Sequence, residues 1–248
     1  MEEFTKLVGL LESLRGDKGC PWDKKQTIKE FKTYLLEEVY ELIDAIEKDD
    51  YKAMQEELGD LLFHIVFIAQ ICRESGIFTI WDVISATHEK MYNRHPHVFK
   101  ETSSDPQIEK RWEEIKKEEK PDYSPLDDVP KGMPALSRAY LISKRASKTG
   151  FDWTRIEDVY EKMYEEIEEM ERAGDIEAQR EEIGDMLFTM ANIARFKGID
   201  PEDALRHACD KFIRRFNYIE KRTNLEGASL KTMDDLWNEA KSIEKKGE

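Results

Sequence analysis

The sequence has little of what marks several common protein classes. Its three cysteines, Cys20, Cys72 and Cys209, are widely spaced and form no CxxC pair, so they indicate neither a disulfide framework nor a zinc finger. The N-terminus is acidic and amphipathic, unlike a signal peptide. No apolar run approaches the ~20 residues that a membrane-spanning helix needs. We expect a cytoplasmic protein with no membrane partner.

Basic residues and turn formers are also scarce. The 39 Lys and Arg residues are outnumbered by 54 Asp and Glu, the net charge is −15, and no long Lys/Arg run is present. Duplex nucleic acid needs a basic face, so we expect no nucleic-acid partner. Only 12 Gly and 8 Pro accompany a charged content of 38%, which favours an all-α fold with charged outer faces.

Apolar residues recur at three- and four-residue spacing, and no segment shows sustained strand alternation. This periodicity predicts helices at roughly 2–15, 27–47, 51–74, 79–93, 106–119, 134–148, 155–173, 176–197, 201–222 and 230–245. The proline-containing stretch between the fifth and sixth helices cannot be one regular helix. We therefore divide the chain into an N-terminal helical domain (1–119), a linker (120–134) and a C-terminal helical domain (135–248).

The two halves carry the same motifs in the same order. Each has an EExxE string, a polar break and then EE[LI]GD[LM]LF. Further along, KMYNR in the first half is matched by KFIRR, and WEEIK is matched by WNEAK. The tryptophan follows the aspartate of the GD pair at the same separation in both halves. This equal spacing indicates a duplication of one helical unit.

Four carboxylates in each half are predicted to converge. Helix residues three or four apart share a face, so each acidic string places two acids on one side. A hairpin folded at Asp49–Asp50, or at Gly174–Asp175, would bring both acid pairs to the same height. The two sets are Glu38, Glu41, Glu57 and Asp60 in the first half, and Glu166, Glu169, Glu182 and Asp185 in the second.

In a glutamate-rich protein, an EExxE string is commonly a solvated helix face. Asp60 and Asp185 argue against that interpretation, because each begins an apolar run, DLLFHIVFIA or DMLFTMANIA. We expect those two helices to be buried on most sides. A buried carboxylate costs several kcal/mol unless a cation or a proton neutralises it. The acids therefore indicate a site for a positive charge.

Oxygen ligands without cysteine or clustered histidine suit a hard cation, Mg²⁺ or, alternatively, Mn²⁺. Because Mg²⁺ is usually shared with substrate phosphates, we expect a polyphosphate substrate. The basic pairs Lys90/Arg94 and Lys211/Arg215 could hold phosphate oxygens or be ordinary surface charges. Trp112 and Trp237 could lie against a base or cap a hydrophobic core.

This constellation resembles the MazG family of nucleoside triphosphate pyrophosphohydrolases. The likeness covers nearly the whole chain and includes GCPWDKKQT (19–27), RHPHVF (94–99), LDDVPKGMPAL in the linker and GFDWT (150–154). It implies tandem all-α helical bundles completed by a homodimer. It also implies Mg²⁺-dependent hydrolysis of nucleoside triphosphates to a monophosphate and pyrophosphate, with broad base tolerance, in nucleotide-pool house-cleaning.

The resemblance also assigns roles to residues. The eight converging acids correspond to metal ligands. As a separate mechanistic hypothesis, we expect Glu165, or Glu37 in the first half, to orient or deprotonate the attacking water. The implied nucleotide contacts are Lys162, Glu165, Lys211, Arg215, Trp237 and Lys241 in the second half, and Lys90, Arg94, Trp112 and Lys116, with Glu37, in the first.

The chain departs from the family pattern at two positions. Tyr34 stands four residues before Glu38, where the second half has Lys162 before Glu166. Ala178 holds a place that is often lysine in relatives, with Arg180 as the available substitute. Because Lys162 adds a phosphate contact that Tyr34 cannot supply, we expect the C-terminal half to carry most of the turnover.

Two other functions fit parts of the pattern. A di-iron carboxylate bundle also uses acids on facing helices, but it needs Glu-x-x-His pairs. Here only His64 lies nearby, and Thr189 occupies the corresponding place in the second half. The alternative that stays open is a non-catalytic nucleotide-binding regulator, which would carry the same acids without turnover.

Overall fold

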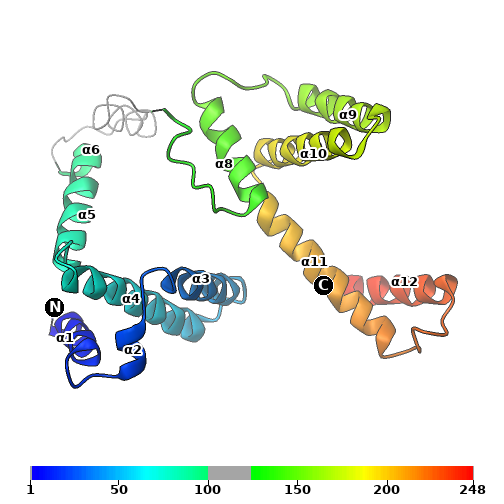
Figure 1. The fold of residues 1–248 in the computed structure, drawn as a ribbon. Helices are drawn as coiled ribbons and strands as arrows, with labels where there is room; N and C mark the ends of the chain where they lie inside the picture. Colours follow the sequence, from blue (N-terminus) through cyan, green and yellow to red (C-terminus); the bar gives the residue numbers. More distant parts are fainter. Residues whose placement is uncertain (1, 100–123, 248) are drawn as a thin grey trace. The chain divides into compact units, whose positions relative to one another are not determined.

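A computed structural model of the chain describes residues 2–99 and 124–247. The chain divides into two compact units, Met1–Glu118 and Glu119–Glu248, called here the N-terminal and C-terminal units (Figure 1). In the described ranges the regular secondary structure is helical and no strand is present, which confirms the all-α prediction. None of the described helices is long and apolar enough to cross a membrane.

The N-terminal unit contains α1 (Glu2–Arg15), α2 (Pro21–Lys25), α3 (Phe31–Glu47), α4 (Tyr51–Glu74), α5 (Ile80–Arg94) and α6 (Pro96–Phe99). The C-terminal unit contains α8 (Ala135–Ser147), α9 (Ile156–Arg172), α10 (Ile176–Phe196), α11 (Pro201–Glu220) and α12 (Leu230–Gly247). The predicted helix at 106–119, residues 120–123 of the predicted linker, Trp112 and Lys116 lie outside the described residues.

Every helix that apolar periodicity predicts within the described ranges is present in the structure. The periodicity missed α2 and α6, which are too short to show a period. The predicted helix at 27–47 begins only at Phe31, because Glu30 closes a turn before it. The Glu30 carboxylate accepts hydrogen bonds from the backbone N–H of Thr27 at 2.6 Å and from its hydroxyl at 2.9 Å. The backbone bonds of this turn, such as that from the Glu30 N–H to the Thr27 carbonyl at 3.1 Å, span three residues instead of the four of an α-helix.

Aspartates mark the turn of each hairpin at the predicted breaks. Asp49 has a φ of 51°, a left-handed conformation that aspartate tolerates better than most residues. The Asp50 carboxylate then accepts two backbone N–H groups of the first turn of α4, both at 3.1 Å. Asp175 caps α10 in the same way, at 3.0 and 2.9 Å. Each cap fixes where its hairpin folds back.

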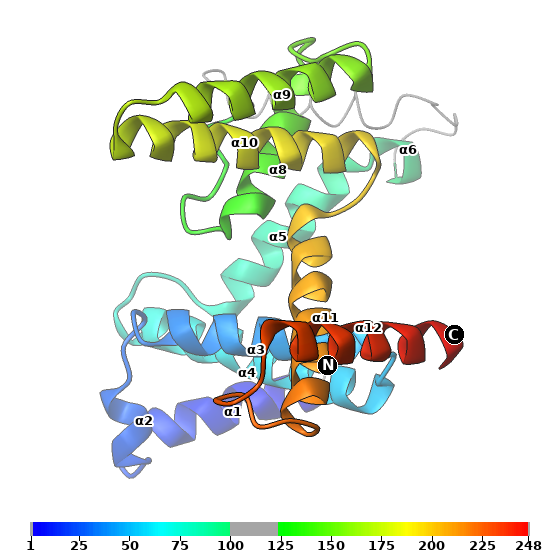
Figure 2. The same cartoon turned by 90° about the vertical axis from the view of Figure 1, so that its right-hand side faces the viewer.

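The two hairpins, α3–α4 and α9–α10, are the central element of each unit. In both, the helices run antiparallel and side by side (Figures 1 and 2). In the N-terminal unit α1 packs on α4, and the buried core joins side chains such as Leu11, Phe31 and Phe67. In the C-terminal unit α8 packs on α10, α11 contacts both of them, and α12 packs on α11.

A buried arginine ties the loop before each hairpin to its second helix. The Arg15 side chain, only 8% exposed, forms a bidentate pair with Glu74 and donates to the backbone carbonyl of Asp23 at 2.6 Å. This pairing holds the pKa of the Glu74 carboxyl below its usual value. Arg195 likewise pairs with Asp152 of the GFDWT string, at 2.5 and 3.0 Å. Sequence reasoning missed both arginines, because one charge at the end of an apolar helix carries no periodic signal.

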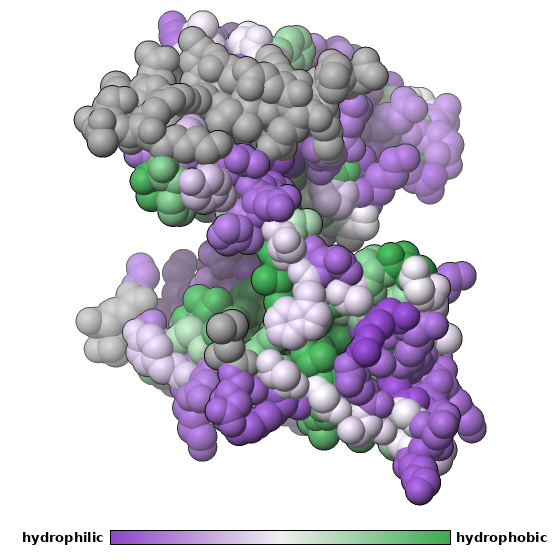
Figure 3. All heavy atoms as spheres, turned by 90° about the vertical axis from the view of Figure 1, so that its left-hand side faces the viewer, coloured by the Kyte–Doolittle hydropathy of each residue, from purple (hydrophilic) through white to green (hydrophobic). Residues whose placement is uncertain are grey.

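The expectation that α4 and α10 are buried on most sides is wrong for the single chain. Leu58 and Ile65 of α4 are 56% and 45% exposed, and Leu187 and Met190 of α10 are 53% and 51% exposed. Asp60 and Asp185 are exposed as well. The physical reason is that each unit supplies few helices to cover its hairpin. Hydrophobic atoms also reach the surface among hydrophilic ones on the side of the molecule where α1 and α5 lie (Figure 3).

Candidate active site

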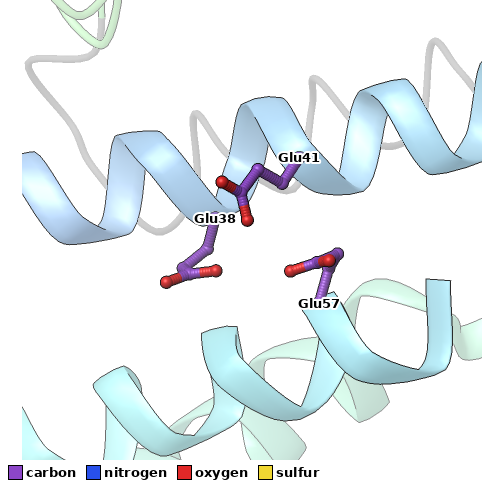
Figure 4. A group of neighbouring side chains, drawn as sticks. All are labelled: Glu38, Glu41 and Glu57. Carbon is purple, nitrogen blue, oxygen red and sulfur yellow. The ribbon is translucent and has the colours of Figure 1, made fainter. Parts of the chain in front are cut away.

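Three carboxylates converge between the helices of each hairpin. Glu38 and Glu41 project from α3 toward Glu57 of α4 (Figure 4), and their oxygens lie within 4.8 Å of one another. We call these three residues the N-terminal cluster. The C-terminal cluster has the same construction, with ligand atoms within 4.8 Å of one another, and consists of Glu166, Glu169 and Glu182.

Asp60 and Asp185, the predicted fourth members, do not belong to these close groups in the structure. Each follows the last glutamate of its cluster by three residues and is exposed. Both are near enough to act electrostatically: Asp60 contributes to raising the pKa of Glu38, and Asp185 contributes to raising that of Glu182. Their assignment as metal ligands stays a prediction.

The carboxylates of each cluster lie so close together that they oppose one another's ionisation. Partial burial, followed by the neighbouring carboxylates, raises the pKa of Glu38, Glu57 and Glu182 above the ordinary carboxyl value. Within the described residues, no ion pair joins a Lys or Arg to the N-terminal cluster. A cation placed among these oxygens would remove the repulsion. These oxygens could therefore hold a divalent cation.

Lys162 distinguishes the C-terminal cluster. Its ammonium nitrogen lies 2.8 Å from a carboxylate oxygen of Glu166 and 3.0 Å from one of Glu165. Glu166 is only 4% exposed, so this ion pair is partly shielded from water. The two carboxylates raise the pKa of Lys162 above its usual value, and the side chain stays charged. Lys162 was predicted to contact the nucleotide, and in the structure two acids hold its ammonium group.

The other predicted nucleotide contacts of the C-terminal unit lie on a different hairpin, α11–α12. Arg215 of α11 is held by Glu244 of α12 at 2.7 Å and lies over the Trp237 ring, 5.4 Å from its centroid. Lys211 and Lys241 are exposed on the same two helices. Figures 1 and 2 place α12 at the end of α11 that is remote from α9 and α10. Within one chain, the structure therefore does not bring these residues to the acids.

The remaining predicted residues belong to neither close group of carboxylates. Lys90 is exposed in α5, a helix whose buried residue is Ile80 in its first turn, and Arg94 is its last residue. Glu37 is exposed one residue before Glu38. Arg180 donates to Glu177 at 2.8 Å, so the structure does not show it replacing the lysine that is missing at Ala178.

The family of the chain follows from comparison with known sequences. A family model described as the MazG nucleotide pyrophosphohydrolase domain matches residues 26–99 and 154–219, so each match contains one carboxylate cluster. The chain belongs to this family. The resemblance given by the sequence motifs is confirmed, and the MazG domain is present twice, as the internal repeat predicted.

Two relatives that match over nearly their whole length are named nucleoside triphosphate pyrophosphohydrolases. The chain is 45% identical over 245 residues to a Thermotoga maritima protein named nucleoside triphosphate pyrophosphohydrolase/pyrophosphatase MazG, covering 96% of this chain and 95% of that protein. It is 42% identical over 260 residues to the Escherichia coli K12 nucleoside triphosphate pyrophosphohydrolase, covering 98% and 99%. It is also 46% identical to Bacillus subtilis YabN, an uncharacterized protein, and this match spans 53% of YabN.

Proposed function

We propose that this MazG-family protein hydrolyses nucleoside triphosphates to a nucleoside monophosphate and pyrophosphate, with Mg²⁺ as cofactor and tolerance for several bases. Mn²⁺ is expected to replace Mg²⁺. The observation that carries the proposal is the cluster of three carboxylates within 4.8 Å, built once in each unit. The names of the full-length relatives supply the reaction.

The residues present fit a hard divalent cation. The donors are carboxylate oxygens from two facing helices, and partial burial followed by the neighbouring carboxylates raises the pKa of Glu38, Glu57 and Glu182. When bound, Mg²⁺ would hold the oxygens of the triphosphate, neutralise charge and lower the pKa of the attacking water. In the N-terminal unit the ion would be held by Glu38, Glu41 and Glu57, joined by Asp60. In the C-terminal unit it would be held by Glu166, Glu169 and Glu182, joined by Asp185.

The chain's own side chains then supply proton transfer and charge. Glu165, or Glu37 in the first unit, takes the proton of the water that attacks the α-phosphorus. A new P–O bond forms there as the bond to the α–β bridging oxygen breaks, and that oxygen leaves with pyrophosphate. Cationic side chains stabilise the charge on the leaving group. Lys162, Lys211, Arg215 and Lys241 are assigned to this task, and Trp237 to the base.

We also propose that the active form is a homodimer. The exposed apolar side chains of α4 and α10 need covering, and a second copy with the same hairpins could cover them. A second copy could also bring an α11–α12 hairpin to the acids, which a single chain keeps apart from it. Light scattering at micromolar concentration should give the mass of a dimer. A monomer that retains full activity would contradict this part of the proposal.

The reaction can be tested by following oxygen. Several nucleoside triphosphates should be incubated with the protein and Mg²⁺ in ¹⁸O-labelled water. The products should then be separated and their molecular masses measured. Attack at the α-phosphorus places the label in the monophosphate, whereas attack at the β-phosphorus places it in pyrophosphate. EDTA should stop the reaction and added Mg²⁺ should restore it. Diphosphate and inorganic phosphate as main products would overturn the assignment, and binding without turnover would favour the regulator.

A further inference from the structure

The two carboxylate clusters differ in one charged position. Lys162 and Tyr34 each stand four residues before the first glutamate of their cluster, Glu166 or Glu38. On a helix this spacing places them on the same face as that glutamate. The Lys162 ammonium uses the position to pair with Glu166 at 2.8 Å, and Tyr34 carries no charge.

Tyr34 is partly buried and packs against the hydrophobic core of the N-terminal unit. Its ring stacks on His64, with centroids 5.9 Å apart, and contacts Phe31 edge-on at 5.7 Å. His64 does not replace the missing cation, because burial lowers its pKa below the usual histidine value and keeps it mainly neutral near pH 7. Among the described residues, the N-terminal cluster therefore has no counterpart of Lys162 to offset its negative charge.

Resting on the proposed function, we infer that Lys162 is a resident counter-ion that makes metal binding at the C-terminal cluster depend on nucleotide, while the N-terminal cluster binds metal by itself. A divalent cation entering beside Lys162 meets a positive charge within hydrogen-bond distance of Glu166. The triphosphate removes that obstacle, because its oxygens attract the ammonium away from Glu165 and Glu166. Metal and substrate therefore enter the C-terminal site together.

The repulsion sets the size of the effect. A divalent ion and an ammonium about 5 Å apart repel each other by an amount that corresponds, even in a water-like medium, to roughly a tenfold or larger loss of affinity. Without nucleotide, the full-length protein should therefore show two classes of Mn²⁺ site, which differ about tenfold or more in affinity. The tighter class belongs to the N-terminal cluster and the weaker class to the C-terminal cluster.

The test is a titration with Mn²⁺ alone, in which electron paramagnetic resonance measures the free ion. Glu41→Gln should remove the tight class, and Glu169→Gln should remove the weak class. Lys162→Met should tighten the weak class about tenfold, whereas Lys162→Arg, which keeps the charge, should leave it unchanged. Because Lys162→Met leaves the buried Glu166 without its cation, Tyr34→Lys gives an independent test. It adds a charge and should weaken the tight class about tenfold.

The outcomes separate this inference from the proposed function. If Mn²⁺ binds both clusters equally and neither Lys162→Met nor Tyr34→Lys changes its affinity, the counter-ion role of Lys162 is overturned and the metal site stands. If wild-type protein binds no Mn²⁺ at either cluster, even with an α,β-methylene triphosphate analogue, both are overturned. A weak class that this analogue tightens in wild-type protein would support the inference directly.

Discussion

Replacing Glu38 by glutamine should stabilise the metal-free protein. Glu38 has two carboxylate neighbours, Glu41 and Glu57, with oxygens within 4.8 Å. At that separation each pair of charges costs roughly 1 kcal/mol in a water-like dielectric. Glu38 is partly exposed, and salt screens part of this repulsion. Removing its charge should therefore add about 1–2 kcal/mol to the free energy of unfolding, which raises the melting temperature by about 2–8 °C.

The pH dependence of this gain has a definite sign. The pKa of Glu38 is raised in the folded protein, so its ionisation destabilises the fold. Above this raised pKa the wild-type carboxylate is charged and the glutamine variant holds its full advantage. As the pH falls through the raised pKa toward the ordinary carboxyl value, wild-type Glu38 becomes protonated. The difference between the two proteins should then shrink toward zero.

Magnesium should reverse the order of stability. A ligand that binds only the folded state at about 100 times its dissociation constant adds about 2.7 kcal/mol. Wild-type protein has all three carboxylates of its N-terminal cluster and gains this term, whereas Glu38→Gln lacks one ligand and gains less. Calorimetry in EDTA and in Mg²⁺ measures both effects. Glu89→Gln, a change at an exposed acid on α5 outside the cluster, is the matched control for loss of one negative charge.

Two results would refute this reasoning. One is a lower melting temperature for Glu38→Gln than for wild type in EDTA at pH 7, since carboxylate repulsion would then not be the dominant effect at this position. The other is a Glu89→Gln variant that shows the same gain and the same response to Mg²⁺. Net charge, rather than the cluster, would then explain both observations.

Two further predictions concern the C-terminal unit. Glu169→Gln should lower the turnover of triphosphate by roughly 10²-fold or more, because it removes a ligand from the metal. Glu41→Gln should leave much of the activity. Steady-state assays of both variants with saturating Mg²⁺ would show the reverse pattern if the N-terminal unit carried out the turnover. Asp175→Ala should lower the free energy of unfolding by about 1 kcal/mol, because it removes the cap of α10. Asp50→Ala should cause a similar loss at α4, measured by urea unfolding. An unchanged unfolding midpoint for both variants would mean that neither cap contributes to stability.

Local spacing allowed much of this protein to be predicted. The apolar period located the long helices, and Asp50 and Asp175, which follow the ends of α3 and α9, marked where the hairpins turn. Glu38 and Glu41 share a face because three residues are nearly one helical turn, so their meeting with Glu57 followed once the break was placed. These features depend on residues close together in the chain and on one short turn.

The tertiary structure decided which charges meet across larger distances. It left Asp60 and Asp185 outside the close groups and placed Arg215 against Glu244 on a separate hairpin. It also left Leu58 and Leu187 exposed, although their apolar sequences predict burial. Side-chain pairing and burial depend on which other helices pack nearby, and helical periodicity contains no information about those partners.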